Sequence, residues 1–340
     1  MLSHDHRPNP QPPALPSVWN LFGMRTSPYA PEAPGAENSR DDLDAFVGRQ
    51  SELAELTSYV HGCHGSRIPI VGAAGVGKTA FVRALSARLR ADEYWSTSEL
   101  VIPIPGESAD ALISRALTVV SRTIIQNGRA STDTVAMQEV QSALAAWDPE
   151  REVAPFYLMQ AQRLLHQIIT NTYDNESRGV ILHLKIPADL DAASIALVAR
   201  RLLDLRDSML LMPGLHVLLT GTRNAVAEAV AKRSQMSSIF RMPTYVEPLS
   251  ISEVLTLLQH RYEAAARGAN QPVTAPVDPA VVAYLCESLA GNLKAMLQTL
   301  DGMVTQWLTL GGHTRPGSIQ PLSLVTLRKM QRAKRSTEQT

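Results

Sequence analysis

Hydrophobic positions follow two alternating patterns from Phe46 to about residue 222. Short runs of consecutive apolar residues, typical of strands buried on both faces, alternate with longer segments whose apolar residues recur every three or four positions. The predicted strands span residues 68–71, 100–104, 179–184 and 216–220. The predicted helices span residues 51–61, 78–90, 109–126, 156–173 and 192–211. This order predicts a parallel sheet with helices on both faces, which is a three-layer α/β domain.

After Pro248 the pattern predicts helices and no strands. Ser250 and Glu253 form a capping box that starts one helix, and two more are predicted over residues 280–289 and 293–310. A small all-helical domain therefore follows the α/β domain. Residues 129–150 are polar and loosely patterned, and we interpret them as an insertion. The predicted boundaries are a proline-rich arm over 1–45, the α/β domain over 46–249, the helical domain over 250–312 and a basic tail over 313–340.

The first 45 residues contain eight of the 22 prolines and almost no periodic apolar pattern. Because proline fixes its own φ and restricts the residue before it, we expect an extended arm. Residues 18–29 interrupt it with Trp19, Phe22 and Tyr29, which indicates a segment that docks. We favour docking on the chain's own core, with docking on a neighbouring molecule as the alternative.

Composition narrows the class of protein. Of the 340 residues 45% are apolar, which excludes wholesale disorder, and 32 basic residues balance 32 acidic ones. A globally basic protein is thereby excluded, although the tail from Arg315 carries six basic residues against one acid. No apolar window of 18 residues and no signal-peptide pattern occur, so we expect a cytoplasmic protein without a membrane contact.

The two cysteines are too few for a disulfide scaffold and fit a reducing compartment. Cys286 lies on an apolar helix face and is expected in the core. Cys63 stands between His61 and His64, giving three potential metal ligands in four residues. No second cluster follows at metal-site spacing, so an ordinary loop is favoured over a zinc site.

A phosphate-binding loop is the strongest chemical signal. Residues 72–79 match G-x-x-x-x-G-K-[ST] at every fixed position, after an apolar strand and before an amphipathic helix. Backbone N–H groups and the helix N-terminus would bind phosphates, Lys78 would contact the β- and γ-phosphates, and the Thr79 hydroxyl would ligate Mg²⁺. ATP and Mg²⁺ are therefore the predicted cofactors. The predicted contacts in this segment are Gly72, Ala73, Ala74, Gly75, Val76, Gly77, Lys78, Thr79 and Ala80.

Residues 46–53, which read FVGRQSEL, resemble the box that opens many AAA+ ATPases and the related STAND ATPases. Together with the phosphate loop, this resemblance covers residues 46–310. It implies a five-stranded parallel sheet with a helical lid. It also implies that the backbone near Phe46 and Val47 contacts the adenine base, and that Arg49 helps to anchor the segment.

Three further positions follow from the resemblance. The fourth strand and the residues after it, 216–224, resemble the family's sensor strand. Thr220, Thr222 and Asn224 are alternatives for its polar sensor residue. Asn224 is taken as a catalytic candidate with Lys78 and Thr79. Residues 291–294 resemble the lid motif whose basic residue reaches the γ-phosphate, with Lys294 replacing the usual arginine. A surface role for Lys294 is an equal alternative. An arginine acting on a neighbouring subunit would be Arg233 or, second, Arg241.

The third strand departs from the AAA+ pattern. The family usually ends this strand with two acids, one for Mg²⁺ and one for the attacking water. Here residues 180–184 run into Lys185, while Asp189 and Asp191 follow several residues later. His183 is at best a weak substitute and is more typical of a packed core histidine. The resemblance therefore implies nucleotide binding with slow or impaired hydrolysis.

Among AAA+ proteins, the chain is similar to transposon-encoded target-selection regulators and to origin-recognition-type initiators. This implies ATP-dependent self-association through the nucleotide site, a protein partner, and DNA contact through the basic tail. One alternative is a STAND-type signalling or defence switch that recruits an effector protein without nucleic acid. Another is a regulatory subunit that keeps the phosphate loop for stability alone.

Overall fold

The computed structural model describes residues 18–30, 46–127, 134–148, 154–175, 178–231, 233–266, 273–309 and 320–338. These residues form two compact units. The sheet unit comprises residues 35–257 and 286–296, and the helical unit comprises residues 1–34, 258–285 and 297–340. Among the described residues, no helix combines the length and the apolar character needed to cross a lipid bilayer.

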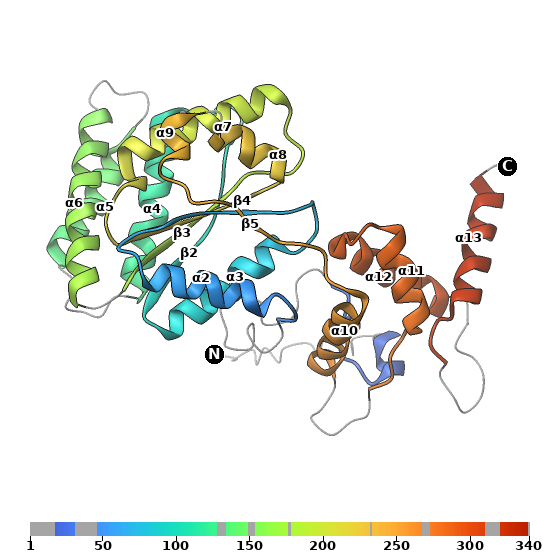
Figure 1. Ribbon diagram of the computed structural model, residues 1–340. Coiled ribbons are helices and arrows are strands. Elements are labelled where there is room, and N and C mark those ends of the chain that lie inside the picture. The colour runs from blue at the N-terminus through green and yellow to red at the C-terminus, as the bar shows by residue number, and fades with distance from the viewer. Residues whose placement is uncertain are drawn as a thin grey trace, which may run out of the picture. The chain divides into compact units, whose positions relative to one another are not determined.

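The sheet unit is built on five parallel strands in the order β2-β3-β4-β1-β5 (Figure 1). The strands are β1 (Arg67–Val71), β2 (Tyr94–Val101), β3 (Gly179–Lys185), β4 (Leu215–Gly221) and β5 (Thr244–Tyr245). All of β4 and nearly all of β3 are buried, as expected for strands covered on both faces. The predicted three-layer parallel-sheet fold is confirmed. The two-residue β5 was too short to be predicted from its pattern.

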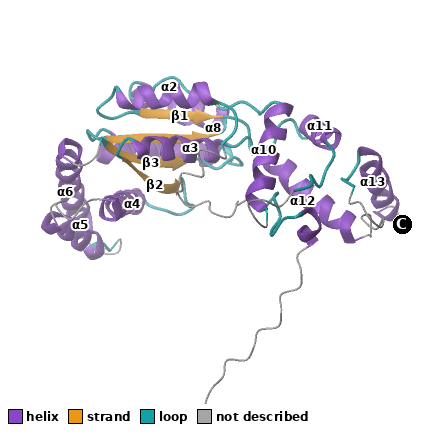
Figure 2. Ribbon diagram, turned by 90° about the horizontal axis from the view of Figure 1, so that it is seen from below, coloured by secondary structure: helices purple, strands orange, loops and turns teal. Residues whose placement is uncertain are grey.

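Helices cover both faces of this sheet (Figures 1 and 2). On one face, α2 (Gln50–His61) and α3 (Lys78–Ala91) share a core with β1, which includes Leu56, Phe81 and Ile70. On the other face, a larger core joins α4 (Ala109–Asn127), α6 (Ala154–Asn175) and α7 (Ala192–Leu205) to the strands. The remaining elements here are η2 (Arg206–Leu210), α8 (Arg223–Val226), η3 (Ala227–Ala231) and α9 (Ser234–Ser237).

The segment interpreted as an insertion contains a helix, α5 (Thr134–Ala146). Met137, Val140 and Ala143 are buried at a spacing of three residues and belong to the larger core. This stripe is one residue wide, which explains why the sequence reads as loosely patterned. Residues 129–133, 149 and 150 of the predicted insertion lie outside the described residues.

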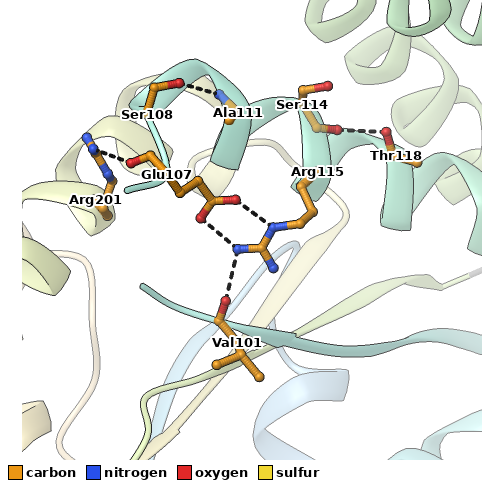
Figure 3. A network of polar contacts seen from close by, with 8 residues as sticks. All are labelled: Val101, Glu107, Ser108, Ala111, Ser114, Arg115, Thr118 and Arg201. Carbon is orange, nitrogen blue, oxygen red and sulfur yellow. Dashed lines mark hydrogen bonds and ion pairs between the residues drawn. The ribbon is translucent and has the colours of Figure 1, made fainter. Parts of the chain in front are cut away.

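Strand β2 begins six residues and ends three residues earlier than predicted. The sequence indicated residues 100–104, but the strand runs over Tyr94–Val101 and is half exposed in its middle. A polar network fixes its end (Figure 3). Arg115 donates to the Val101 carbonyl at 2.9 Å and forms two hydrogen bonds of 2.8 Å with the Glu107 carboxylate. Arg201 donates to the Glu107 carbonyl at 2.6 Å, so β2, α4 and α7 are tied together.

The helical unit contains helices and, among its described residues, no strand beyond isolated bridges. Its helices are α11 (Pro279–Ser288) and α13 (Leu324–Glu338), together with the larger parts of α10 (Ile251–Ala265) and α12 (Leu293–Thr309). Figure 2 shows this part of the chain as helix and loop. The helical C-terminal region agrees with the predicted all-helical character.

The aromatic segment of the arm packs on this same helical unit. It begins with the short helix η1 (Val18–Phe22), and Trp19, Phe22 and Tyr29 are all buried. The Phe22 ring lies 6.3 Å from the Trp307 ring, and the hydroxyls of Tyr29 and Tyr262 are 2.9 Å apart. Burial raises the pKa of both tyrosines, that of Tyr262 to about 12. Of the two docking alternatives, the structure therefore shows docking on the chain itself.

Candidate nucleotide-binding site

The phosphate loop connects β1 to α3 and requires its glycines. Gly75 and Gly77 have φ angles of 72° and 102°, in the left-handed region that favours glycine. A Cβ on Gly72 would lie 2.5 Å from the Val246 carbonyl oxygen, so a side chain does not fit there. The N-terminus of α3 follows directly, with its unpaired N–H groups and partial positive charge. The loop thus has the form of an anion-binding cradle.

Lys78 lies at the start of α3 with its ammonium group turned back on the loop. Its Nζ donates to the carbonyls of Gly72 at 3.0 Å and Ala73 at 2.7 Å. Burial lowers the pKa of Lys78, and the nearby charge of Lys185 lowers it further. A phosphate group in the cradle would relieve both effects, because it supplies negative charge and acceptor oxygens.

The Thr79 hydroxyl faces an acid that the sequence analysis did not identify. Its Oγ1 donates to Oε2 of Glu99, on β2, at 3.4 Å. The other carboxylate oxygen of Glu99, Oε1, accepts from Lys185 Nζ at 2.7 Å. Glu99 was missed because the strand was expected to begin at Leu100. Residues 96–99 are all polar, so no local pattern marked this part of the strand.

The end of β3 carries Lys185 and Ile186 where the family pattern has its two acids. Asp191 caps α7, because its Oδ1 accepts from the Ser194 N–H at 2.8 Å, and this hydrogen bond lowers the pKa of the carboxyl group. Asp189 is exposed in the loop after β3. In the structure, as in the sequence, β3 therefore ends without the two acids of the AAA+ pattern.

His183 is a packed core residue. It is 6% exposed, and its Nε2 lies 3.1 Å from the Thr220 hydroxyl on the neighbouring strand. Burial lowers its pKa to about 4, so the ring is neutral at physiological pH. The hydrogen bond with Thr220 engages its Nε2 within the sheet.

The predicted adenine-contacting segment is tied to the phosphate loop through Arg49. Its guanidinium donates to the Val76 carbonyl at 2.9 Å and to the Glu247 carbonyl at 2.6 Å. Phe46, three residues earlier, packs edge-on against Phe81 at 6.2 Å between ring centres, and Val47 is half-buried. The segment that opens the family box is therefore positioned beside the loop, with Arg49 as its anchor.

Of the three sensor alternatives, two are engaged locally. Thr220 is buried, and its hydroxyl donates to the Leu184 carbonyl at 3.3 Å. Thr222 caps α8, because its Oγ1 accepts from the Ala225 N–H at 3.3 Å. Asn224 is exposed on the first turn of α8. The structure thus leaves Asn224 as the alternative with an accessible side chain.

The motif at residues 291–294 reaches the phosphate loop through its backbone. The Lys294 N–H donates to the Gly75 carbonyl at 3.2 Å, while the Lys294 side chain is exposed. Asn292 caps the helix by accepting from the Ala295 N–H at 3.0 Å, and its side chain occupies the space beside Gly75 that a Cβ would need. Asn292 is a second contact that the sequence analysis missed.

The two candidate arginines differ in their surroundings. Arg241 pairs with Glu55 at 2.8 Å and lies over the Tyr59 ring at 4.4 Å, and its backbone N–H bonds to Arg67 at the start of β1. The phosphate loop leaves the opposite end of that strand. Arg233 is exposed just before α9. Neither arginine is brought into the phosphate loop of its own chain.

Other candidate residues lie apart from the loop. The His61 ring pairs with Asp92 at 3.2 Å and stacks on Tyr94. Within the described part of the chain, no three His, Cys, Asp or Glu residues are grouped to hold a metal ion. Cys286 is half-buried, not fully buried as expected, with its Sγ 3.5 Å from Met296 Sδ.

Comparisons with known proteins agree with this geometry. A family model described as AAA ATPase domain matches residues 45–220, just over half of the chain. No curated protein matches the chain at a significant level. The ORC2 protein of Aeropyrum pernix, solved as ADPNP–ADP complexes, has a TM-score of 0.51 and 13% identity, over 86% of this chain and 71% of that chain.

Two other solved structures are similar at lower scores. The ORC1 protein of Aeropyrum pernix, solved in complex with DNA, has a TM-score of 0.47 and 15% identity, over 83% of this chain and 64% of that one. Cdc6p of Pyrobaculum aerophilum has a TM-score of 0.47 and 13% identity, over 84% and 66%. At these identities the likeness concerns the fold alone. Through the matched family model and the phosphate-loop architecture, the chain belongs to the AAA ATPase domain family and is an AAA+ P-loop protein.

Proposed function

We propose that this protein binds ATP with Mg²⁺ and acts as a nucleotide-dependent assembly factor or regulator, on DNA and with a protein partner, and that it hydrolyses ATP slowly. The observation that carries the proposal is the combination of a complete phosphate loop with a third strand that ends in Lys185. The loop provides what phosphate binding needs, whereas the strand lacks the carboxylate that usually orients the attacking water.

The residues present fit ATP and Mg²⁺. The loop offers backbone N–H groups, a mobile ammonium on Lys78, and a threonine hydroxyl at the usual metal-ligating position. Phe46 and Val47 form the segment beside the loop where the adenine base is proposed to bind. Lys294 and Asn224 are the proposed contacts to the γ-phosphate, since both side chains are exposed on segments adjoining the site.

The assembly reaction is tested by size-exclusion chromatography with light scattering, in ATP or ADP and with or without duplex DNA, alongside phosphate release. We expect ATP to shift the protein to large assemblies, DNA to enhance this shift, and phosphate release to be slow. If the protein binds ATP but its molecular mass is unchanged by nucleotide and by DNA, the proposed assembly function is contradicted.

Helix α13 is the proposed DNA contact, because it exposes Arg328 and Lys329 in the basic tail. We expect Arg328→Ala together with Lys329→Ala to weaken DNA binding and to lower the slope of log K against log salt by about 1.8, since each phosphate contact contributes about 0.9. Fluorescence anisotropy at several salt concentrations measures this. The control is Val325→Ala, an exposed change on the same helix without a change of charge. An unaltered salt slope would exclude these two residues as phosphate contacts.

Arg233 is the proposed arginine that senses the nucleotide of a neighbouring subunit. We expect Arg233→Ala to keep ATP affinity within about twofold but to abolish the ATP-dependent increase in molecular mass measured by light scattering. Arg241→Ala is the matched control, because Arg241 is already engaged with Glu55 and Tyr59 in its own subunit. If Arg241→Ala blocks assembly and Arg233→Ala does not, the assignment is reversed.

The second candidate function is a STAND-type switch, which the same third strand favours. Such a protein would hold nucleotide tightly and recruit an effector protein without DNA. Nucleotide binding without DNA-dependent assembly would support this function instead of the first.

A further inference from the structure

We propose that Glu99, on the edge strand β2, is the carboxylate that holds the Mg²⁺ of the bound nucleotide together with Thr79. It would replace the acid that AAA+ proteins usually carry at the end of the third strand. This inference rests on the proposed binding of ATP, and it assigns the metal-binding acid that the sequence left open.

The strand register places Glu99 on the correct face of the sheet. Glu99 pairs with His183, and Val101 pairs with Lys185, in the parallel ladder between β2 and β3. Paired residues and residues two apart share a face, so Glu99 and Lys185 point to the same side. Leu218 of β4, which pairs with His183, belongs to the core on the α3 side. Glu99 therefore lies on the face that carries α3, near the strand ends where the phosphate loop begins.

The distances suit a shared metal ion. Mg²⁺ binds oxygen ligands at about 2.1 Å in an octahedron, so two adjacent ligands lie about 3 Å apart. Glu99 Oε2 and Thr79 Oγ1 are 3.4 Å apart before any metal is bound. A small rotation of either side chain gives the ligand spacing, or a single water bridges the metal and the carboxylate. One carboxylate with a hydroxyl and phosphate oxygens is the usual Mg²⁺ set.

Lys185 orients the Glu99 carboxylate. The ion pair of 2.7 Å binds Oε1 and leaves Oε2 directed at Thr79. The Glu99 side chain is 26% exposed, so a hydrated ion can reach it. The Arg115 hydrogen bond to the Val101 carbonyl fixes the backbone two residues beyond Glu99 (Figure 3). The register of β2 shifts between Ser96 and Glu99, and from Glu99 to Val101 it pairs regularly with β3, so Glu99 projects from a paired strand end, as suits a metal ligand.

The other nearby acids are less suited. Asp191 has its carboxylate engaged at the N-terminus of α7, and Asp189 is exposed in the loop after β3. Of these three acids, Glu99 is the one that forms a hydrogen bond with Thr79. Asp189 is the useful comparison because it is an exposed acid that follows β3 and its replacement disturbs no described hydrogen bond.

The experiment compares ATP binding in Mg²⁺ and in EDTA for wild type, Glu99→Gln and Asp189→Asn, using full-length protein and isothermal titration calorimetry. We expect Mg²⁺ to tighten binding to wild type and to Asp189→Asn. In Glu99→Gln this gain should fall by about 10-fold or more, the scale seen when a carboxylate partner of a metal site is removed. The affinity in EDTA should be unchanged or higher, because a negative charge near the phosphates has been removed. Binding of Mn²⁺ to the ATP complex, followed by electron paramagnetic resonance, should weaken in parallel.

Each outcome separates the inference from the proposed function. If wild type binds no ATP with or without metal, the proposed function fails. If wild type binds ATP and Glu99→Gln retains the full Mg²⁺ gain, or Asp189→Asn loses it, the assignment of Glu99 is wrong while ATP binding stands. If Mg²⁺ does not change the affinity of the wild type for ATP, the assignment of Glu99 is also overturned. A misfolded Glu99→Gln would lose affinity in EDTA as well, which the expected result does not show.

Discussion

Lys78→Ala is expected to weaken ATP binding by about 10–100-fold. The Lys78 ammonium is the charged donor that the structure places on the inner side of the phosphate loop, where it now bonds to the carbonyls of Gly72 and Ala73. A hydrogen bond to a charged group contributes about 1.5–3 kcal/mol, and each 1.4 kcal/mol is tenfold in affinity. Calorimetric titration with ATP and with ADP measures the loss.

The control for this prediction is Arg88→Ala, which removes a cation from the last turn of the same helix, away from the loop. We expect it to leave the affinity for ATP within about twofold, since the charge of this partly exposed side chain lies far from the loop and is screened by salt. Should Arg88→Ala and Lys78→Ala weaken ATP equally, the effect is one of general electrostatic attraction and the phosphate-loop assignment loses its support. A Lys78→Ala variant that is less stable but binds ATP normally would favour a loop kept for stability alone.

Phe22→Ala is expected to lower the free energy of unfolding of the helical unit by about 3–5 kcal/mol. Phe22 is 1% exposed and lies against Trp307, beside the buried Trp19. Replacing a buried phenylalanine by alanine removes its burial energy and leaves a cavity, and losses of about 3–5 kcal/mol are typical. Urea denaturation followed by tryptophan fluorescence measures this, because two of the four tryptophans, Trp19 and Trp307, lie in the unit that loses the contact.

Leu21→Ala is the matched control, since Leu21 is the preceding residue of the same short helix but is 40% exposed. We expect it to change the free energy of unfolding by about 0.5 kcal/mol or less, as for most surface substitutions. Phe22→Leu, which conserves most of the volume, should cost less than about 1.5 kcal/mol. Equal effects of Leu21→Ala and Phe22→Ala would show that the arm contributes little stability.

The strands buried on both faces were predictable because burial on two faces leaves an unbroken apolar run. The predicted strands at residues 179–184 and 216–220 agree with β3 and β4 to within one residue at each end. β2 lies at the edge of the sheet, where its middle residues are partly exposed and its sequence mixes Thr97 and Glu99 with apolar residues. The longest apolar run nearby lies after it, so the prediction moved to residues 100–104.

Because β2 was predicted too late in the sequence, part of the site was missed. The phosphate loop is a continuous motif, and every residue of it could be predicted from local sequence. The contact between Glu99 and Thr79 depends on which strands are neighbours and on their register, which no local pattern records. Likewise, Asn292 meets Gly75 across more than 200 residues of sequence. Such long-range contacts can be identified only in the folded structure.

The strand that leads into the phosphate loop acquires its neighbours late during synthesis. β1 is flanked in the sheet by β4 and β5, and Arg67 pairs with Val217, about 150 residues further on. At 5–20 residues per second, a ribosome needs about 10–30 s to make that stretch. For this time the apolar strand and its loop emerge without their partners, and β1 gains its second neighbour in the sheet only after residue 245 has left the exit tunnel. A chaperone that covers β1 during this interval would protect the chain from aggregation.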